Sequence, residues 1–157
     1  MKIVTYPEKV LQNRTKDIGK IDKKVRDLIP KMWKGLEESK GVGLAAPQIG
    51  VNLNIAVIGF DPTPEQLEKD PSLKPIPHMV LINPKVTWSQ KGEKIEKEAC
   101  LSVPQKEVMV PRPSKIHLEF LDESGKRRKL KAKGLMARVI QHELDHLNGK
   151  LIVNYEK

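Results

Sequence analysis

Two histidines and a glutamate in the stretch QHELDH, residues 141–146, could hold a metal ion and use it for chemistry. On a helix, side chains four positions apart point within about 40° of the same direction, so His142 and His146 can reach one ion. Glu143 points about 100° away from His142, which places its carboxylate near the ion but outside its ligands. Water bound to such an ion has a pKa of about 7, and a neighbouring carboxylate can move its proton. The pattern predicts a hydrolytic metal site.

A third ligand must come from another part of the chain. Cys100, in EKEACLSVP, is the only cysteine. A thiolate with two imidazoles would leave a fourth position for water, as catalytic zinc-type sites do. The alternatives are a cysteine buried as a small apolar residue and a pair of histidines on a solvated helix face. The other histidines, His78 and His117, are expected to be solvated or locally hydrogen-bonded.

Hydrophobic periodicity predicts the helices that must position these side chains. Residues 134–147 show helical spacing and end at Asn148-Gly149, a usual stop signal. A second amphipathic helix is predicted over residues 21–38, with Asp22 as its N-cap. Pro30 should kink or split that helix, because proline cannot donate to the preceding turn.

Alternating and turn-bounded segments predict several short strands. The segment 61–77 is predicted to be a loop insertion with about one helical turn, opened by a capping box of Thr63 and Gln66. This mixture predicts an α+β fold with mainly antiparallel sheets packed around a C-terminal metal-binding helix, in one domain over residues 1–157. The predicted strands are 51–60, 79–82, 85–90 and 115–121, the last followed by a hairpin turn into KRRKLKAK, residues 126–133.

Composition narrows the classes of function. The chain has 29 Lys and Arg against 20 Asp and Glu, a formal charge of +9 that favours acidic partners such as RNA. One cysteine excludes an intramolecular disulfide, and the apolar runs are too short to cross a bilayer. We therefore expect a cytoplasmic protein with no membrane role. Aromatic residues do not interleave with the basic residues 126–133, so a solvated strand face is favoured there over RNA binding.

Three motifs in order resemble those of the peptide deformylases: GVGLAAPQ (41–48), EACLSVP (98–104) and QHELDHL (141–147). The opening IVTYPEKVLQNRT resembles the same family, so the likeness covers nearly the whole chain. It implies a metal-dependent hydrolase that removes the formyl group from N-formylmethionyl nascent peptides and releases formate. It also implies one divalent metal per chain, Fe²⁺ in the cell with Zn²⁺, Ni²⁺ or Co²⁺ able to replace it. The ligands would be Cys100, His142 and His146.

The resemblance also implies roles for residues around that metal. Glu143 would be the general acid/base, while the side-chain amide of Gln48 and the backbone N–H of Leu101 would stabilise the oxyanion. Glu98 and Arg112 would form an ion pair that steadies the cysteine loop, with a plain surface pair as the alternative. An extended substrate peptide would place its methionine side chain in an apolar pocket, where core packing is the alternative role for the apolar residues. The candidate substrate contacts are Val42, Gly43, Leu44, Ala99, Leu135 and Val139.

The chain departs from the family pattern at Ala99, where glycine usually precedes the cysteine. If that position needs a positive φ, the added Cβ would cost about 1 to 2 kcal/mol and change the substrate groove. The insertion 61–77 is also longer than expected for the family.

Two other functions fit less well. In a zinc endopeptidase the third ligand normally lies downstream, yet only 11 residues follow His146. An RNA-binding module with a structural metal would fill all four positions with protein atoms. No direct role on DNA is expected, and ribosome association through the basic segment 126–133 is a hypothesis.

Overall fold

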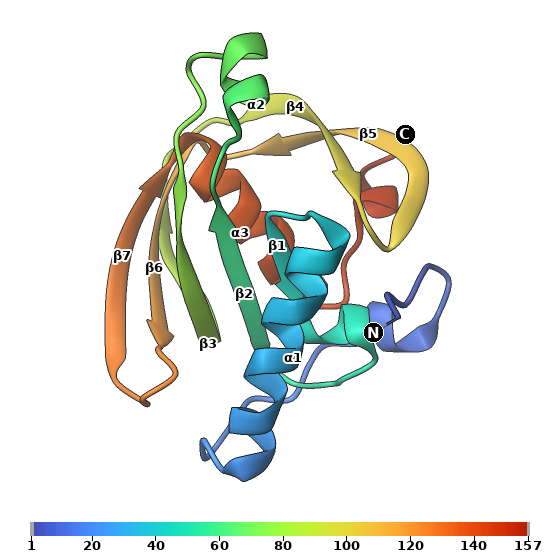
Figure 1. Ribbon diagram of the computed structural model, residues 1–157, viewed down its shortest axis with the longest axis vertical. Coiled ribbons are helices and arrows are strands. Elements are labelled where there is room, and N and C mark those ends of the chain that lie inside the picture. The colour runs from blue at the N-terminus through green and yellow to red at the C-terminus, as the bar shows by residue number, and fades with distance from the viewer. Residues whose placement is uncertain (1, 157) are drawn as a thin grey trace.

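The computed structural model describes residues 2–156 and contains two antiparallel sheets with α-helices packed against them (Figure 1). The larger sheet has five strands in the order β1-β2-β3-β6-β7, and β4 pairs with β5 in a separate hairpin. The predicted α+β class is confirmed. The helices are α1 (Lys23–Ser39), α2 (Pro64–Lys69) and α3 (Gly134–Leu147). The strands are β1 (Gly43–Ala45), β2 (Ile55–Phe60), β3 (Ile76–Ser89), β4 (Lys94–Cys100), β5 (Val103–Arg112), β6 (Lys115–Leu121) and β7 (Arg127–Lys133).

The larger sheet is covered by a different helix on each face. α3 packs with β6, where Ile116, Leu118 and Phe120 are buried beside Ile140 of the helix. α1 packs on the opposite face at the other end of the sheet, over β1 and β2, as Figure 1 shows. The core on the α1 side joins apolar residues of the helix to those of β1, β2 and β3: Leu28, Met32, Leu36, Leu44, Ile55, Val57, Val80 and Ile82.

α3 has the bounds that the sequence predicts, and its C-terminal end is tied to the start of the chain. Gly149 has a φ of 76°, the left-handed conformation expected of a stop residue. A Cβ at Gly149 would lie 2.7 Å from the backbone oxygen of Gln12, so only glycine fits this contact. The backbone N–H and the hydroxyl of Thr15 both donate to the Leu147 carbonyl, at 2.9 and 2.8 Å. These contacts fix the end of the helix that carries both histidines.

α1 confirms the predicted cap but not the predicted break. The Asp22 carboxylate accepts a hydrogen bond from the Val25 backbone N–H at 3.1 Å, as an N-cap does. The helix continues through Pro30, so the predicted split does not occur, and a kink at Pro30 stays a prediction. The apolar face of α1 is buried on the sheet, and this burial outweighs the local cost of a proline, about 3 kcal/mol.

The strand predictions need three corrections. β2 begins at Ile55 rather than Val51, and its residues 55–58 are all buried because helices cover both faces of the sheet there. The predicted strands 79–82 and 85–90 form one strand, β3, which has register shifts around Asn83 and before Trp88. The predicted strands include none of β1, β4 and β5. The predicted hairpin between β6 and β7 is confirmed.

The insertion carries the predicted helical turn. α2 opens with a complete capping box, in which the Gln66 backbone N–H donates to Thr63 Oγ1 at 3.1 Å. The Thr63 backbone N–H donates in return to Gln66 Oε1 at 2.8 Å. Among residues 2–156, no helix combines the length and the apolar character needed to cross a membrane.

Candidate metal centre

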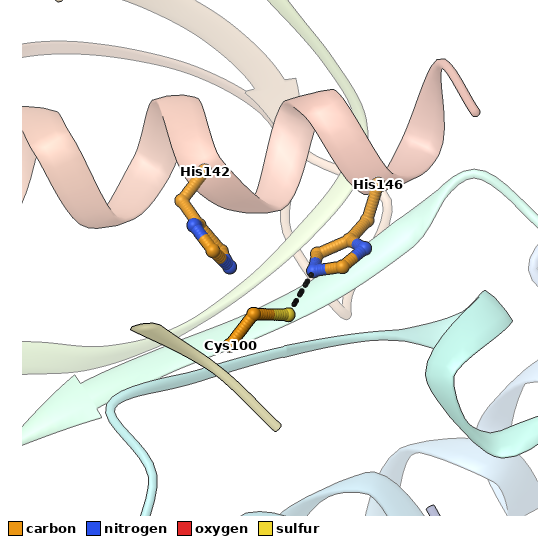
Figure 2. A group of neighbouring side chains, drawn as sticks. All are labelled: Cys100, His142 and His146. Carbon is orange, nitrogen blue, oxygen red and sulfur yellow. Dashed lines mark hydrogen bonds between the residues drawn. The ribbon is translucent and has the colours of Figure 1, made fainter. Parts of the chain in front are cut away.

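Cys100, His142 and His146 converge at the end of β4, below one face of α3 (Figure 2). One potential ligand atom from each lies within 4.8 Å of the others. The Cys100 sulfur is 3.3 Å from Nε2 of His146. The helix supplies both imidazoles because they are four residues apart, and the β4–β5 turn brings the thiol to them. The structure thus brings together the three residues that the sequence proposed as ligands.

The donor set fits a divalent transition metal. One thiolate and two imidazoles suit zinc and iron, and the cluster is largely buried. The His142 Nδ1 lies 3.0 Å from Glu98 Oε1, which leaves Nε2 of His142 as the ring nitrogen that can bind an ion beside Cys100. Burial lowers the pKa of His146 well below its usual range, and the positive charges of His142 and Arg112 lower it further. His146 is therefore neutral, the state in which imidazole binds metals.

His142 is held in a different protonation state. Burial alone would lower its pKa, but hydrogen bonds with Cys100 and Glu98 outweigh burial and raise the pKa to about 10. An ion must therefore displace a proton from this ring to bind, which makes metal affinity dependent on pH.

Glu143 lies beside the cluster in a space that depends on a glycine. The side chain is 3% exposed, and its Oε1 has no hydrogen-bond partner among the described residues. A Cβ at Gly43 would lie 2.5 Å from Glu143 Oε2, so β1 can pass this close only with glycine. Burial raises the pKa of Glu143 to about 7, partly opposed by the charges of His142 and Arg112. A carboxyl group with that pKa can both take up and release a proton near neutral pH.

Gln48 is held with its amide at the cavity wall. It is 2% exposed, and its Oε1 accepts a hydrogen bond from the Ala45 backbone N–H at 2.9 Å. Its Nε2 donates to Ser102 Oγ at 3.3 Å, and the amide carries a second N–H that can serve a ligand. Backbone hydrogen bonds from Val4 to Gln48 and from Tyr6 to Ser102, at 2.7 and 2.8 Å, tie both loops to the N-terminal segment.

A cavity of about 590 Å³ opens beside these groups and takes in most of the predicted substrate contacts. Leu44 is the exception among them: it is fully buried in the core under α1, so its side chain does not line the cavity. The sequence did not single out Arg138 or Pro104, which also line it. The predicted residues that do line the cavity are Val42, Gly43, Gln48, Glu98, Ala99, Cys100, Leu101, Leu135, Val139, His142 and Glu143.

Ala99 is not strained. It pairs with Glu107 in the β4–β5 ladder and is not among the residues with positive φ. The condition for the expected backbone cost, a positive φ, is therefore not met. Ala99 is exposed and is among the residues that line the cavity.

Glu98 and Arg112 form the predicted ion pair, and the pair is buried rather than on the surface. The Arg112 Nε and Nη2 donate to the two Glu98 oxygens at 2.6 and 2.9 Å, and the side chains are 4% and 7% exposed. Arg138 adds a third hydrogen bond to Glu98, at 2.6 Å. The Arg112 Nη1 donates to Asp145 at 2.9 Å, and the Tyr155 hydroxyl donates to the same Asp145 oxygen at 2.8 Å. This network holds the carboxylate that orients His142.

Sequence reasoning missed Arg138, Asp145 and Tyr155. The signal for Arg138 was present, because positions 138, 142 and 146 repeat every four residues along one helix face. Asp145 follows His142 by three positions and lies on a neighbouring row. Tyr155 had no such signal, since it reaches the network from the turn after α3.

Acid should weaken the fold through Glu98. Burial would raise the pKa of Glu98, but hydrogen bonds from Arg112 and His142 and the charge of Arg112 outweigh it and lower the pKa to about 2. Because the folded-state pKa is below the ordinary value of 4.5, the stabilisation is complete above pH 4.5 and is lost as the pH falls towards 2. Urea unfolding midpoints measured across this range should decline in the wild type. The decline should be shallower in Glu98→Gln, and an equal decline in both would contradict the assignment.

Comparisons with known proteins agree with this geometry. The polypeptide deformylase family model matches residues 1–157. A peptide deformylase of Synechococcus sp. (strain CC9605) is 44% identical over 154 residues, which are 98% of this chain and 72% of the relative. The crystal structure of a probable peptide deformylase from Synechococcus phage S-SSM7 superposes with a TM-score of 0.85 at 35% identity, covering 99% of both chains.

A third likeness concerns a structure with a bound peptide. The Met-Ala-Ser-bound peptide deformylase of Acinetobacter baumannii gives a TM-score of 0.90 at 26% identity, covering 99% of this chain and 98% of that one. A family match over the whole sequence, together with a Cys-His-His cluster and a buried glutamate at one cavity, shows that this chain is a hydrolase belonging to the peptide deformylase family.

Proposed function

We propose that this chain removes the formyl group from N-formylmethionyl nascent peptides and releases formate, in the cytoplasm. The observation that carries the proposal is the meeting of Cys100, His142, Glu143 and Gln48 at one cavity, with His146 completing the cluster of possible ligands. The Met-Ala-Ser bound to the Acinetobacter baumannii relative is the peptide that formyl-Met-Ala-Ser would leave after losing its formyl group. We treat residues 1–157 as one catalytic domain, since the family model spans them.

We propose that Cys100, His142 and His146 hold one divalent ion, Fe²⁺ in the cell, with Zn²⁺, Ni²⁺ or Co²⁺ able to replace it. When bound, the ion would supply Lewis acidity that polarises the formyl oxygen and makes water a better nucleophile. The neutral His146 and the Glu98-oriented ring of His142 support this assignment.

The protein groups then divide the remaining work. Glu143 takes a proton from the attacking water and passes it to the methionine nitrogen as the C–N bond breaks. The Gln48 amide and the Leu101 backbone N–H donate to the oxygen that becomes negative in the transition state. The products are formate and a free amino terminus.

Two unpaired strand edges flank the cavity and suit an extended peptide. β1 is an outer strand of the larger sheet, and β4 pairs only with β5. Each therefore has one edge with unpaired backbone groups, to which a peptide can add as a further strand. Gly43 and Leu44 of β1 and Ala99 of β4 would contact the peptide backbone. The apolar side chains of Val42, Leu135 and Val139 would take the methionine side chain.

Adding a methyl group at Gly43 should impair catalysis without removing the metal. In Gly43→Ala the new Cβ would overlap Glu143 Oε2 and push the carboxylate out of place. A displacement of about 1 Å at a reacting group can lower turnover by about 100-fold. We expect that fall in kcat, measured by formate release, with metal content unchanged by elemental analysis. Wild-type kcat in Gly43→Ala would show that the Glu143 position is not critical.

Replacing Cys100 by serine should weaken metal binding or change which ion is retained. Serine is a poorer, harder ligand than a thiolate and favours different metals. Removing even an outer partner of a metal ligand lowers affinity by about 10- to 100-fold, so the loss here should be at least that large. The measurement is metal content after dialysis against a chelator. Full metal retention and full activity in Cys100→Ser would remove this residue from the site.

The function itself is tested by purifying the protein anaerobically with Fe²⁺ and assaying formyl-Met-Ala-Ser. We expect one formate for each Met-Ala-Ser formed, and no cleavage of the internal peptide bonds. Internal cleavage without formate would instead support a zinc endopeptidase. Neither product, from metal-loaded protein, would contradict the proposal.

A further inference from the structure

One face of the β3–β6–β7 part of the larger sheet is left open by the helices. On β6, the buried residues Ile116, Leu118 and Phe120 face α3. Because side chains alternate along a strand, the residues between them point to the opposite side. α1 covers that side over β1, β2 and residues 80–82 of β3, with Leu121 at the end of β6 packed against the same core, and the rest of β6 and β7 lie beyond it in Figure 1. We call this exposed surface the outer sheet face. It carries Lys115, His117 and Glu119 of β6 and, opposite them in register, Lys133, Lys131 and Lys129 of β7.

A β-bulge turns a tryptophan onto the outer sheet face. The register of β3 shifts between Val86 and Trp88, so Trp88 pairs with His117 rather than with the inward-facing Ile116. The Trp88 and His117 rings lie with their centroids 4.6 Å apart, inclined at 39°. Trp88 is 47% exposed, an unusual position for the largest apolar side chain. The two rings form an aromatic platform on the outer sheet face, where the end of β3 meets the start of β6.

The charges around this platform are mainly positive. β3, β6 and β7 together contain a single acidic residue, Glu119, and its carboxylate is 3.7 Å from Lys129. Lys115 lies two residues before His117 on β6, and Lys131 is directly opposite His117 on β7. The platform is therefore flanked by exposed lysines on both strands, with further cations at Lys85, Arg127 and Lys133.

An aromatic platform between rows of cations is the arrangement that binds single-stranded nucleic acid. Bases stack on the rings, and lysines hold the phosphates. The segment 126–133 lacks aromatic residues, which favoured a solvated strand on sequence grounds. The fold changes this, because Trp88 comes from a strand that lies far earlier in the chain. Docking on an anionic bilayer would need several apolar side chains projecting beyond the charges, and Trp88 is the one large apolar side chain of the described β3, β6 and β7 that is exposed.

We propose that the outer sheet face binds single-stranded RNA, with a base stacked on Trp88 and His117 and with Lys115 and Lys131 on the neighbouring phosphates. This goes beyond the hydrolytic site, which lies on the other side of the sheet under α3. The proposal that this face binds a single-stranded nucleic acid does not depend on the proposed function. The choice of RNA over DNA does depend on it, because an enzyme that acts on nascent chains works close to RNA.

The test measures binding of metal-loaded protein to a fluorescent single-stranded RNA of about 12 nucleotides by anisotropy. Trp88→Ala should weaken binding about tenfold, the usual loss of one stacked base. Lys115→Glu/Lys131→Glu should weaken it by more than tenfold, and affinity should fall steeply between about 50 and about 200 mM salt. The matched control, Lys24→Glu/Lys31→Glu on the exposed side of α1, changes the net charge equally and should alter affinity no more than about twofold.

A direct readout comes from the indole itself. In a Trp33→Phe background Trp88 is the only tryptophan, and RNA should quench its fluorescence. Deformylation of a short formyl peptide should be unchanged in every variant, which shows that the proteins are folded and separates this proposal from the enzymatic one.

Several outcomes would overturn the proposal. One is the absence of wild-type binding at low salt. Another is an equal loss in the α1 control, which would indicate attraction by net charge alone. Unchanged affinity in Trp88→Ala would exclude the stacking platform. Tighter binding to phosphatidylserine vesicles or to single-stranded DNA than to RNA, with the same dependence on Trp88, would assign the outer sheet face to that partner instead.

Discussion

Replacing Glu143 by glutamine should lower kcat for formate release by about 10²- to 10⁴-fold, the usual contribution of a positioned acid/base group. Glutamine keeps the volume that packs against Gly43, so the cavity and the metal ligands should be undisturbed. It cannot take a proton from water, because the amide has no basic site near neutral pH. Stopped assays on formyl-Met-Ala-Ser and elemental analysis of the same preparation measure both effects.

The pH dependence gives a second readout of Glu143. The group must be deprotonated to act as a base, so kcat/KM in the wild type should fall as the pH drops through its pKa. That pKa is about 7 without an ion, and a nearby cation lowers it because it favours the carboxylate. We therefore expect the acidic limb to lie below pH 7 and to disappear in Glu143→Gln.

The control for this substitution is Glu123→Gln, in the exposed turn between β6 and β7, which should leave kcat unchanged. If Glu143→Gln retained wild-type kcat, another group would have to move the proton. If it lost its metal, the lower activity would no longer report on acid/base catalysis, and the placement of Glu143 outside the ligands would be wrong.

The features that could be predicted best from the sequence are those that depend on local periodicity and on residue type. α3 could be predicted with its bounds because apolar spacing and the Asn148-Gly149 stop agree along one segment. The ligands could be proposed because few residue types bind transition metals and the chain has a single cysteine. Their meeting could not be derived from periodicity, because it depends on how β4 and β5 turn beneath the helix.

The structural features that could not be predicted from the sequence depend on which other segments pack against each one in the fold. β3 continues through Asn83 because this residue adopts a φ of 49° at a register shift, which allows the strand to bend without ending. Leu44 stays a proposed backbone contact of the peptide, but its side chain turns into the core because α1 packs on that face of β1. The burial of Arg112 could not be foreseen either, since β5 itself was not predicted.

Removing the charge of Arg112 should destabilise the protein by about 3 to 5 kcal/mol, the usual effect of breaking a buried ion pair from one side. In Arg112→Met, Glu98 would keep only Arg138 and His142 as hydrogen-bond partners while its carboxylate stays 7% exposed. Asp145 would also lose its guanidinium partner. Urea unfolding of the metal-loaded protein measures the change in free energy.

The same substitution should loosen the metal site. Glu98 holds Nδ1 of His142, and a carboxylate no longer fixed by Arg112 can rotate away from that ring. Metal affinity should therefore fall by about 10- to 100-fold, as happens when the outer partner of a metal ligand is disturbed. Competition with a chelator measures this loss separately from global stability.

The matched control is Arg128→Met, which breaks an ion pair of similar geometry at 2.8 Å but with an arginine 52% exposed. Solvent already screens that pair, so little stability and no metal affinity should be lost.

The double variant Glu98→Gln/Arg112→Met then separates two explanations. If the penalty in Arg112→Met comes from a stranded buried carboxylate, neutralising that carboxylate should recover part of the stability but not the metal affinity, because Glu98 also orients His142. Equal losses of stability in Arg112→Met and Arg128→Met would mean that the buried Glu98–Arg112 pair stabilises the fold no more than an exposed pair does.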